Sequence, residues 1–314
     1  MKDNREVIDV SIIIVNWNTS ELLDRCLLSI DGTVNEIKYE VIVVDNASTD
    51  DSVAHIRDRF ENVVIIENEE NVGFAKANNQ GIEVARGKYI LLLNSDTFLH
   101  EGSVKTLVRY MESYPGTGVA GCRLYYEDGT LQRSCSSFPT LLTETWQLLW
   151  LDKLFPRNQV FGQYLMTYWD LDDFREVDCI LGACMIIRRE AIEEIGLLDE
   201  VFFMYSEEVD LCYRLKLANW KVRFVPEATA THIWGGSANQ VHHTKTFLRL
   251  YRSRVLFFRK HYGIARTMLY KLILLLKSIS RLMLSPFAIV LMKDENAVQK
   301  SHSYWELLKR LPSY

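Results

Sequence analysis

The sequence does not open with the glycine-rich motifs of two large classes of nucleotide-binding protein. No G-x-G-x-x-G follows the first predicted strand, and no G-x-x-x-x-G-K-[ST] occurs in the chain. These motifs bring backbone N–H groups close to phosphates in dinucleotide-binding folds and in P-loop proteins. The sequence therefore supports neither class.

Paired cysteines are also missing, and we expect no secretory leader segment. No C-x-x-C spacing occurs, and several cysteines stand inside apolar runs, which indicates reduced thiols in a core rather than metal ligands or disulfides. The six are Cys26, Cys122, Cys135, Cys179, Cys184 and Cys212. Residues 1–9 are polar and charged, without the apolar stretch of a secretory signal. We therefore expect a cytoplasmic protein.

Acidic residues are absent from Ala228 to Lys293, a region that holds 11 of the 36 lysines and arginines. Its longest uncharged run, 282–292, contains Pro286 and is well short of the ~20 residues that span a bilayer. The pattern predicts helices over 244–262 and 264–292 that lie on the inner face of the cell membrane. A helical cap or a homodimer interface is the alternative. Nucleic acid is disfavoured because the rest of the chain is acidic.

Strand-like and helix-like segments alternate through the first third of the chain. Four apolar runs predict strands: 10–15, 39–44, 63–66 and 88–94. Their alternation with helices predicts an α/β fold with a mainly parallel central sheet. We expect a catalytic domain over 1–240 and a basic, apolar helical extension over 241–314. An inserted loop and helix over 134–174 is expected to cover a pocket.

The apolar run that starts at Lys88 stops abruptly at Asn94-Ser95-Asp96. In open α/β sheets, ligands bind at the carboxyl ends of the strands. A carboxylate at that edge can hold a divalent metal and, through it, a phosphate. The alternative is a turn aspartate that caps the next helix. Asp45 ends the second predicted strand, so it is expected at the same edge.

A second group of carboxylates, Glu207, Glu208 and Asp210, opens a predicted helix directly behind an aromatic cluster. Favourable charge at a helix N-terminus accounts for one or two of them. Like charges crowded beside apolar surface should also raise one pKa, as a general base requires. Gly182 would allow the close approach of a substrate or of another backbone segment. His232 ends another predicted strand, as a structural residue or as a metal ligand.

Six short motifs, in this order, resemble the family 2 glycosyltransferases of GT-A fold, specifically the rhamnosyltransferase-like branch. They are Ser11 to Asn18, Val43 to Asp50, Asn71 to Ala75, Leu92 to Thr97, Glu207 to Asp210, and His232 with Gly235-Gly236-Ser237. The resemblance covers roughly Val10 to Gly263. It implies transfer of a sugar, with inversion, from a nucleotide diphosphate donor such as dTDP-L-rhamnose. The implied acceptor is a saccharide or a polyprenyl-linked saccharide in cell-surface polysaccharide synthesis.

The resemblance also implies roles for individual residues. Contacts with the donor's base and ribose would come from Asp45 and from Val15, Asn16, Trp17 and Asn18. Other implied donor-binding residues are Asn46, Gly73, Phe74, Lys76, Asn94, Ser95 and Asp96. Asp96 and His232 would hold Mg²⁺ or Mn²⁺, and Asn94 stands at the first position of the D-x-D-type motif. Glu208 aligns with the catalytic base, with Glu207 and Asp210 as competitors. The acceptor-side candidates are Gly182, Glu207, Asp210 and Trp234.

Other functions stay open at this stage. A sugar-phosphate nucleotidyltransferase would need a glycine-rich, basic loop after the first strand, and Asn16-Trp17-Asn18-Thr19 is neither. A glycosyltransferase that uses a UDP-sugar is a second alternative. A non-catalytic scaffold that binds the membrane through its C-terminal region is a third.

Overall fold

The computed structural model describes residues 8–34, 36–233, 243–291 and 297–314. The chain divides into two compact units. The α/β unit comprises 1–136, 170–203 and 207–237, and the helical unit comprises 137–169, 204–206 and 238–314. Most of the inserted stretch 134–174 thus belongs with the C-terminal helices. The boundary predicted at residue 240 lies within 234–242, outside the described residues.

A mixed sheet forms the centre of the α/β unit, in the strand order β3-β2-β1-β4-β11-β6-β12-β5. Its strands are β1 (Val10–Asn16), β2 (Tyr39–Asp45), β3 (Val63–Glu67), β4 (Tyr89–Asn94), β5 (Thr97–Leu99), β6 (Thr117–Tyr125), β11 (Cys184–Arg188) and β12 (Lys221–His232), with β7 (Leu131–Gln132) and β9 (Arg175–Glu176) paired at the side. A separate pair joins β8 (Cys135–Ser136) to β10 (Cys179–Ile180). Strands β1 to β4 are mutually parallel, whereas β11 runs antiparallel to β4 and β6.

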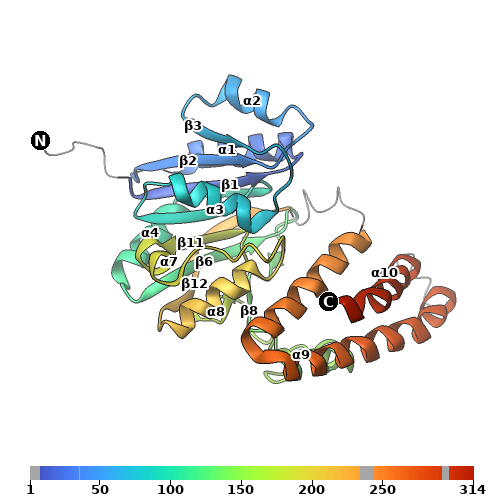
Figure 1. Ribbon diagram of the computed structural model, residues 1–314. Coiled ribbons are helices and arrows are strands. Elements are labelled where there is room, and N and C mark those ends of the chain that lie inside the picture. The colour runs from blue at the N-terminus through green and yellow to red at the C-terminus, as the bar shows by residue number, and fades with distance from the viewer. Residues whose placement is uncertain (1–7, 35, 234–242, 292–296) are drawn as a thin grey trace, which may run out of the picture. The chain divides into compact units, whose positions relative to one another are not determined.

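Helices cover this sheet because their apolar faces pack against the apolar side chains of its strands. They are α1 (Ser20–Thr33), α2 (Ser52–Arg59), α3 (Phe74–Val84), α4 (Ser103–Ser113), α7 (Arg189–Ile195) and α8 (Glu207–Leu217). Helix α1 buries Leu23, Cys26, Leu27 and Ile30 in one core with the aliphatic side chains of β1 and β4. All six cysteines are buried and unbridged, which confirms the prediction of reduced core thiols. Figure 1 shows β1, β2 and β3 side by side, with α2 beyond β3.

The parallel register brings the polar strand ends to one edge. Asn16 pairs with Asp45 between β1 and β2, and Val15 pairs with Asn94 between β1 and β4. The expected common edge for Asp45 and the Asn94–Asp96 turn is therefore confirmed. This edge carries the candidate site.

The helical unit consists of α5 (Leu141–Leu148), α6 (Leu151–Leu154), α9 (His243–Leu291), α10 (Ala297–Arg310) and the 3₁₀ turn η2 (Leu311–Ser313). Helix α9 bends at Gly263, whose φ of 79° is a conformation that glycine adopts more readily than other residues. The bend separates the two predicted helices, 244–262 and 264–292. Helices α5 and α10 pack against α9 (Figure 1). Within the described residues, no helix combines the length and the apolar character that crossing a bilayer requires.

Leu91 tests how far the core depends on β4. It is fully buried between β1 and β11, so we expect Leu91→Ala to lower the free energy of unfolding by about 2–5 kcal/mol. Val64, on the edge strand β3, is 44% exposed and serves as the control, with an expected loss below about 1 kcal/mol for Val64→Ala. Urea unfolding followed by circular dichroism measures both. Equal losses would show that β4 is not the centre of the core.

Candidate active site

A polar network joins the carboxyl ends of β1, β2 and β4. The Asn16 side-chain amide donates to Asp45 Oδ2 (3.3 Å) and to Ser48 Oγ (3.0 Å), and the Ser48 backbone N–H donates to Asp45 Oδ1 (2.9 Å). The Thr19 hydroxyl donates to Asn16 Oδ1 (2.6 Å) and lies 2.9 Å from the Ser95 hydroxyl. Asn16, Asp45 and Ser95 are buried, so these contacts hold the strand ends in one arrangement.

The loop after β1 lies over this network. Val15, Trp17 and Asn18 are half-buried, and Asn18 has a positive φ of 52°. The Asn18 backbone N–H donates to Ser48 Oγ (2.9 Å), while its side-chain oxygen accepts from the Thr49 N–H (2.6 Å). The loops after β1 and β2 are thereby tied together, as a shared base and ribose site would require.

Asn46 anchors the loop that leads into α3. Its Oδ1 accepts from Asn68 Nδ2 (3.0 Å) and its Nδ2 donates to the Gly73 carbonyl (3.2 Å). Gly73 has a φ of +91°, and a Cβ there would lie 2.5 Å from the Phe203 carbonyl oxygen. The Phe74 N–H donates to that same carbonyl (2.7 Å). The segment before α8 is thus bound to the start of α3, from which Lys76 extends as an exposed side chain.

Asp96 and His232 meet at the same edge of the sheet. Asp96 Oδ1 lies 3.3 Å from His232 Nε2, and Asn94 Nδ2 lies 3.5 Å from that nitrogen. The other ring nitrogen, Nδ1, lies 2.7 Å from Oε1 of the buried Gln132. An amide oxygen only accepts, so Nδ1 carries a proton and donates it to Gln132, which orients the ring with Nε2 towards Asp96.

These side chains fit a divalent metal that a diphosphate also ligates. A carboxylate oxygen and an imidazole nitrogen converge, and both kinds of atom ligate divalent metals. Among the described residues, buried Asn94 Oδ1 finds no hydrogen-bond partner, so it is a further oxygen available at this edge. No group of three or more His, Cys, Asp or Glu side chains suited to a metal occurs in the described part of the chain.

The adjacent carboxylates Glu207 and Glu208 have different environments at the start of α8. Glu207 is buried, and its Oε2 has no hydrogen-bond partner among the residues the structure describes. Burial, with the nearby charge of Glu208, raises the pKa of Glu207 well above its usual range. Glu208 is half-buried as a residue, and its Oε2 atom is buried like that of Glu207. The predicted rise of one carboxyl pKa in this group is thus found at Glu207.

Gly182, an acceptor-side candidate, lies beside Glu208, the residue that aligns with the catalytic base. A Cβ at Gly182 would lie 3.8 Å from Glu208 Cβ and 3.9 Å from Phe74 Cε1, which is ordinary contact distance. Asp210 is fully buried and pairs with Arg214 Nε (2.7 Å), which makes it a structural anchor of α8. Trp234, the remaining acceptor-side candidate, lies outside the described residues.

Gln132 and Phe203 are the residues that the sequence interpretation missed. Gln132 sits on the two-residue strand β7, and nothing in its local sequence marks it as the partner of a histidine 100 positions away. Phe203 belongs to the aromatic cluster before Glu207, but its contact is made by a backbone carbonyl. Only the fold shows these roles.

Comparison with known proteins places this geometry in a family. The glycosyl transferase family 2 profile matches residues 11–196. Over 257 residues the chain is 27% identical to the N-acetylglucosaminyl-diphospho-decaprenol L-rhamnosyltransferase of Mycobacterium tuberculosis, covering 76% of this chain and 83% of that protein. It is 26% identical to the Escherichia coli rhamnosyltransferase WbbL, and the alignment covers 79% of this chain and 94% of WbbL.

Solved structures show the same fold. The mannosyltransferase PcManGT from Pyrobaculum calidifontis, in complex with GDP-Man and Mn²⁺, aligns with a TM-score of 0.57 at 15% identity, covering 98% of this chain and 85% of that one. GalNAc-T7 with UDP, GalNAc and Mn²⁺ aligns with a TM-score of 0.55 at 17% identity. This alignment covers 74% of this chain and 45% of the GalNAc-T7 chain. The GT-A fold is thereby confirmed, and the profile covers more than half of the chain. The chain belongs to glycosyl transferase family 2.

Proposed function

We propose that this glycosyltransferase moves a sugar, with inversion, from a nucleotide diphosphate donor to a lipid-linked saccharide. The observation that carries the proposal is the convergence of Asn94, Asp96 and His232 at the carboxyl edge of the sheet. L-rhamnose from dTDP-rhamnose is the proposed donor, because two relatives that align over most of their length are rhamnosyltransferases. The decaprenyl diphosphate in one relative's name supports a polyprenyl-linked acceptor.

The donor is bound by the polar strand ends. The loops after β1 and β2, tied together through Ser48, would receive the base and ribose beside Asp45. The start of α3 would offer the backbone N–H groups of Ala75 and Lys76, and the Lys76 cation, to the phosphates. Bound to Asn94, Asp96 and His232, Mg²⁺ or Mn²⁺ would neutralise the charge on the leaving diphosphate.

Glu208 is the proposed general base. It accepts the proton of the acceptor hydroxyl as that oxygen forms a bond to the anomeric carbon. The bond from the anomeric carbon to the diphosphate oxygen breaks on the opposite side, and the nucleoside diphosphate leaves with that electron pair. This single displacement inverts the anomeric configuration. Gly182 leaves space beside Glu208 for the acceptor, since a side chain there would contact the base.

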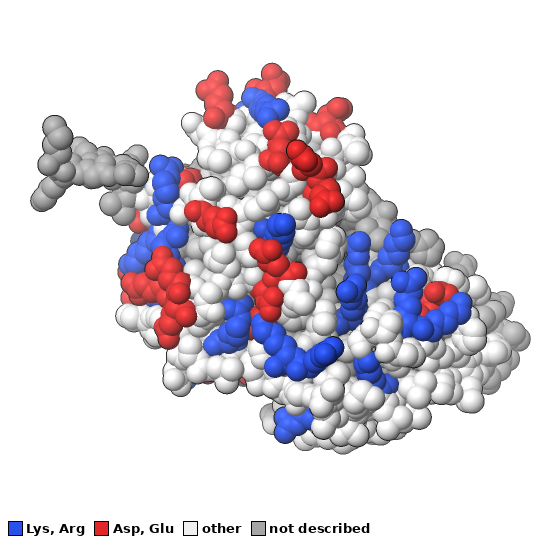
Figure 2. All heavy atoms as spheres, in the orientation of Figure 1, with Lys and Arg blue, Asp and Glu red and all other residues white. Residues whose placement is uncertain are grey.

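The helical unit supports attachment to a membrane surface. Exposed apolar side chains recur about every four residues along α9, which places them on one stripe of the helix. They include Ile264 (72% exposed), Met268 (58%), Leu272 (48%) and Leu276 (47%). In Figure 2 most of the charged side chains over the helical unit are Lys and Arg, whereas several acidic side chains gather over α2 and β3. Apolar surface with basic residues suits an anionic bilayer surface, where a lipid-linked acceptor would reside.

A donor panel tests the proposed function first. We expect dTDP-rhamnose with Mn²⁺ to raise the melting temperature by several degrees, because only the folded state binds it. UDP-, GDP- and CMP-sugars, each with and without Mn²⁺, are the controls in a thermal-shift assay. A larger shift with a UDP-sugar would replace the donor assignment. No shift with any donor would instead favour a non-catalytic, membrane-binding scaffold.

Glu208→Gln should lower the rate of transfer by roughly 10²–10⁴-fold, because the amide cannot accept the proton. Donor binding should persist, since the change lies on the acceptor side. The transfer rate and the donor-induced thermal shift measure the two effects. Near-normal turnover in this variant would remove Glu208 from the mechanism.

Glu207→Gln is the matched control, with the same chemical change one residue earlier. The native-state pKa of Glu207 lies above its ordinary value, near 4.5, so the native state binds the proton more tightly than the unfolded state. This contribution to stability is present below about pH 4.5 and is lost as the pH rises through the native-state pKa. Glu207→Gln should therefore retain transfer and be more stable than the wild type at pH 8, as urea unfolding at several pH values measures. Loss of transfer in this variant alone would make Glu207 the base.

Gln132→Leu tests the positioning of His232. Without the Gln132 oxygen, the proton is no longer held on Nδ1, and Nε2 loses its orientation. The Mn²⁺ concentration needed for half of the donor-induced thermal shift should rise by about 10–100-fold. Gln132→Glu, which keeps the acceptor oxygen, should retain most of the affinity. An unchanged Mn²⁺ requirement in Gln132→Leu would separate His232 from metal binding.

A further inference from the structure

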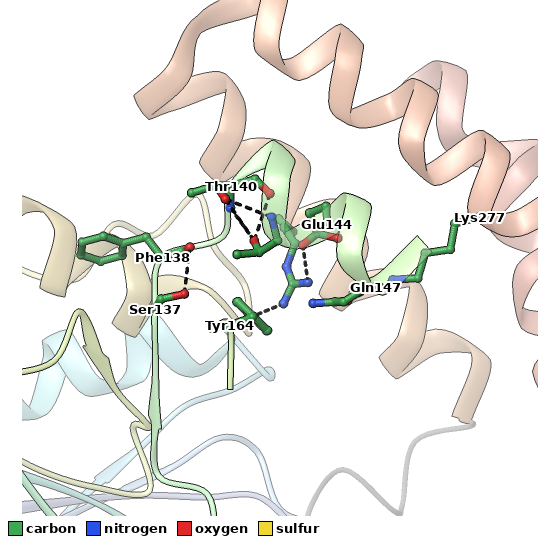
Figure 3. Close-up of polar contacts among 9 residues, drawn as sticks. Ser137, Phe138, Thr140, Glu144, Gln147, Tyr164 and Lys277 are labelled. Carbon is green, nitrogen blue, oxygen red and sulfur yellow. Dashed lines mark hydrogen bonds and ion pairs between the residues drawn. The ribbon is translucent and has the colours of Figure 1, made fainter. Parts of the chain in front are cut away.

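The helical unit buries more positive than negative charge. Glu144 on α5 is fully buried, and its Oε1 pairs with Arg254 Nη1 at 2.8 Å. Arg254 also donates to the Tyr164 hydroxyl (2.5 Å). Figure 3 shows Glu144 and Gln147 on the same helix, with Tyr164 beside the first and Lys277 reaching the second. The Glu144 carboxylate thus pairs with Arg254, and the positive charge of Lys277 has no such ion pair within the described ranges.

Lys277 forms no ion pair with an acidic side chain in the part of the chain that the structure describes. Only 5% of its surface is exposed, yet the one acceptor for its Nζ is the neutral Gln147 Oε1, at 3.1 Å. Burial is the main cause that lowers its pKa, and the charges of Arg254 and Arg281 add to the effect, while the charge of Glu144, already paired with Arg254, opposes it. A buried ammonium group needs an anion to offset its lost hydration.

Arg281 lies one helical turn beyond Lys277, on the same face of α9. Its Nη2 donates to the Gln147 backbone carbonyl (3.0 Å), and its guanidinium stacks over the Trp150 ring at 3.1 Å from the ring centre. Its Nη1 is buried with no hydrogen-bond partner among the described residues. Asp152 acts on Arg281 but forms no ion pair with it in the described structure. Two cations therefore converge on one uncharged residue, Gln147.

Neighbouring tyrosines do not balance this charge. Burial raises the pKa of Tyr251, over whose ring the Lys277 ammonium lies at 5.5 Å, to about 12. Burial also raises the pKa of Tyr304, which faces both cations. Both rings stay neutral at physiological pH. They supply hydroxyl groups and apolar walls, which suits an anion with several oxygen acceptors.

We propose that Lys277 and Arg281, held together by Gln147, bind a phosphate or diphosphate group carried by a lipid. A phosphate presents several oxygens to a lysine and an arginine at once, and it would pair the buried charges. The lipid is indicated by exposed apolar side chains on the same helix, since Leu284 lies three residues beyond Arg281, on the same side of α9, and is 48% exposed. Free phosphate would gain nothing from such apolar neighbours.

Two kinds of lipid carry such a phosphate group. One is a polyprenyl-linked acceptor with its diphosphate, and this assignment rests on the proposed function. The other is a bulk anionic lipid with its headgroup, and this assignment is independent of the proposed function. The phosphate site itself is inferred only from the charges of the helical unit.

Binding of geranyl diphosphate to the full chain, by isothermal titration calorimetry, tests the site. We expect Lys277→Gln and Arg281→Gln each to weaken binding at least tenfold. Arg266→Gln removes an exposed positive charge from the same helix and is the matched control, with an expected change below twofold. Arg281→Lys keeps the charge and should restore part of the affinity, which separates binding from folding. Equal weakening in all three glutamine variants, or none, would overturn the proposal.

Three further ligands identify the source. Inorganic diphosphate that binds as tightly as geranyl diphosphate would overturn the lipid assignment. Phosphatidylglycerol vesicles that compete with geranyl diphosphate, while phosphatidylcholine vesicles do not, would support a bulk headgroup. A raised KM for a polyprenyl-linked acceptor in Lys277→Gln, with an unchanged donor-induced thermal shift, would support the acceptor. Failure of that donor shift in the wild type would count against the proposed function and leave the phosphate-site result intact.

Discussion

The antiparallel pairing of β12 with β5 is the contact on which the candidate site depends. It sets His232 opposite Thr97, and the Ile233 N–H donates to the Asp96 carbonyl at 2.9 Å. Asp96 follows the end of β4 at the edge of the sheet. His232, more than 130 residues later in the chain, ends β12 at the same edge. The backbone ladder thus fixes the distance between the two side chains before any ligand binds. Such preorganisation lowers the cost of assembling a site when substrate arrives.

The two glutamates at the start of α8 show how one residue of separation changes a carboxylate. Successive positions on a helix point in directions about 100° apart, so Glu207 enters the core and Glu208 remains half-buried. Burial favours the neutral form of Glu207. Glu208 is the more exposed of the two residues, although its Oε2 atom is also buried. The more exposed position suits a base that must accept a proton from an acceptor.

The two units bury charge in different ways. In the α/β unit, buried Asp210 is paired with Arg214, and buried Asp45 accepts hydrogen bonds from Asn16 and Ser48. In the helical unit, buried Lys277 and half-buried Arg281 form no ion pair with an acidic side chain of the described residues, although the charges of Glu144 and Asp152 act on them. Paired charges stabilise a fold, whereas a buried charge without an ion-pair partner suits a ligand that supplies one.

The sequence by itself determined the α/β class, the strand ends that carry Asp45 and Asp96, and the helix that begins at Glu207. Those features follow from local patterns, namely apolar runs, their polar ends and the charge at a helix start. Only the tertiary structure decided that Gln132 orients His232, that Phe203 binds the start of α3, and that residues 137–169 pack with the C-terminal helices. It also decided that Lys277 is buried, although its sequence pattern is that of a surface helix. These outcomes depend on contacts between residues far apart in the chain, and a local sequence pattern does not predict such contacts.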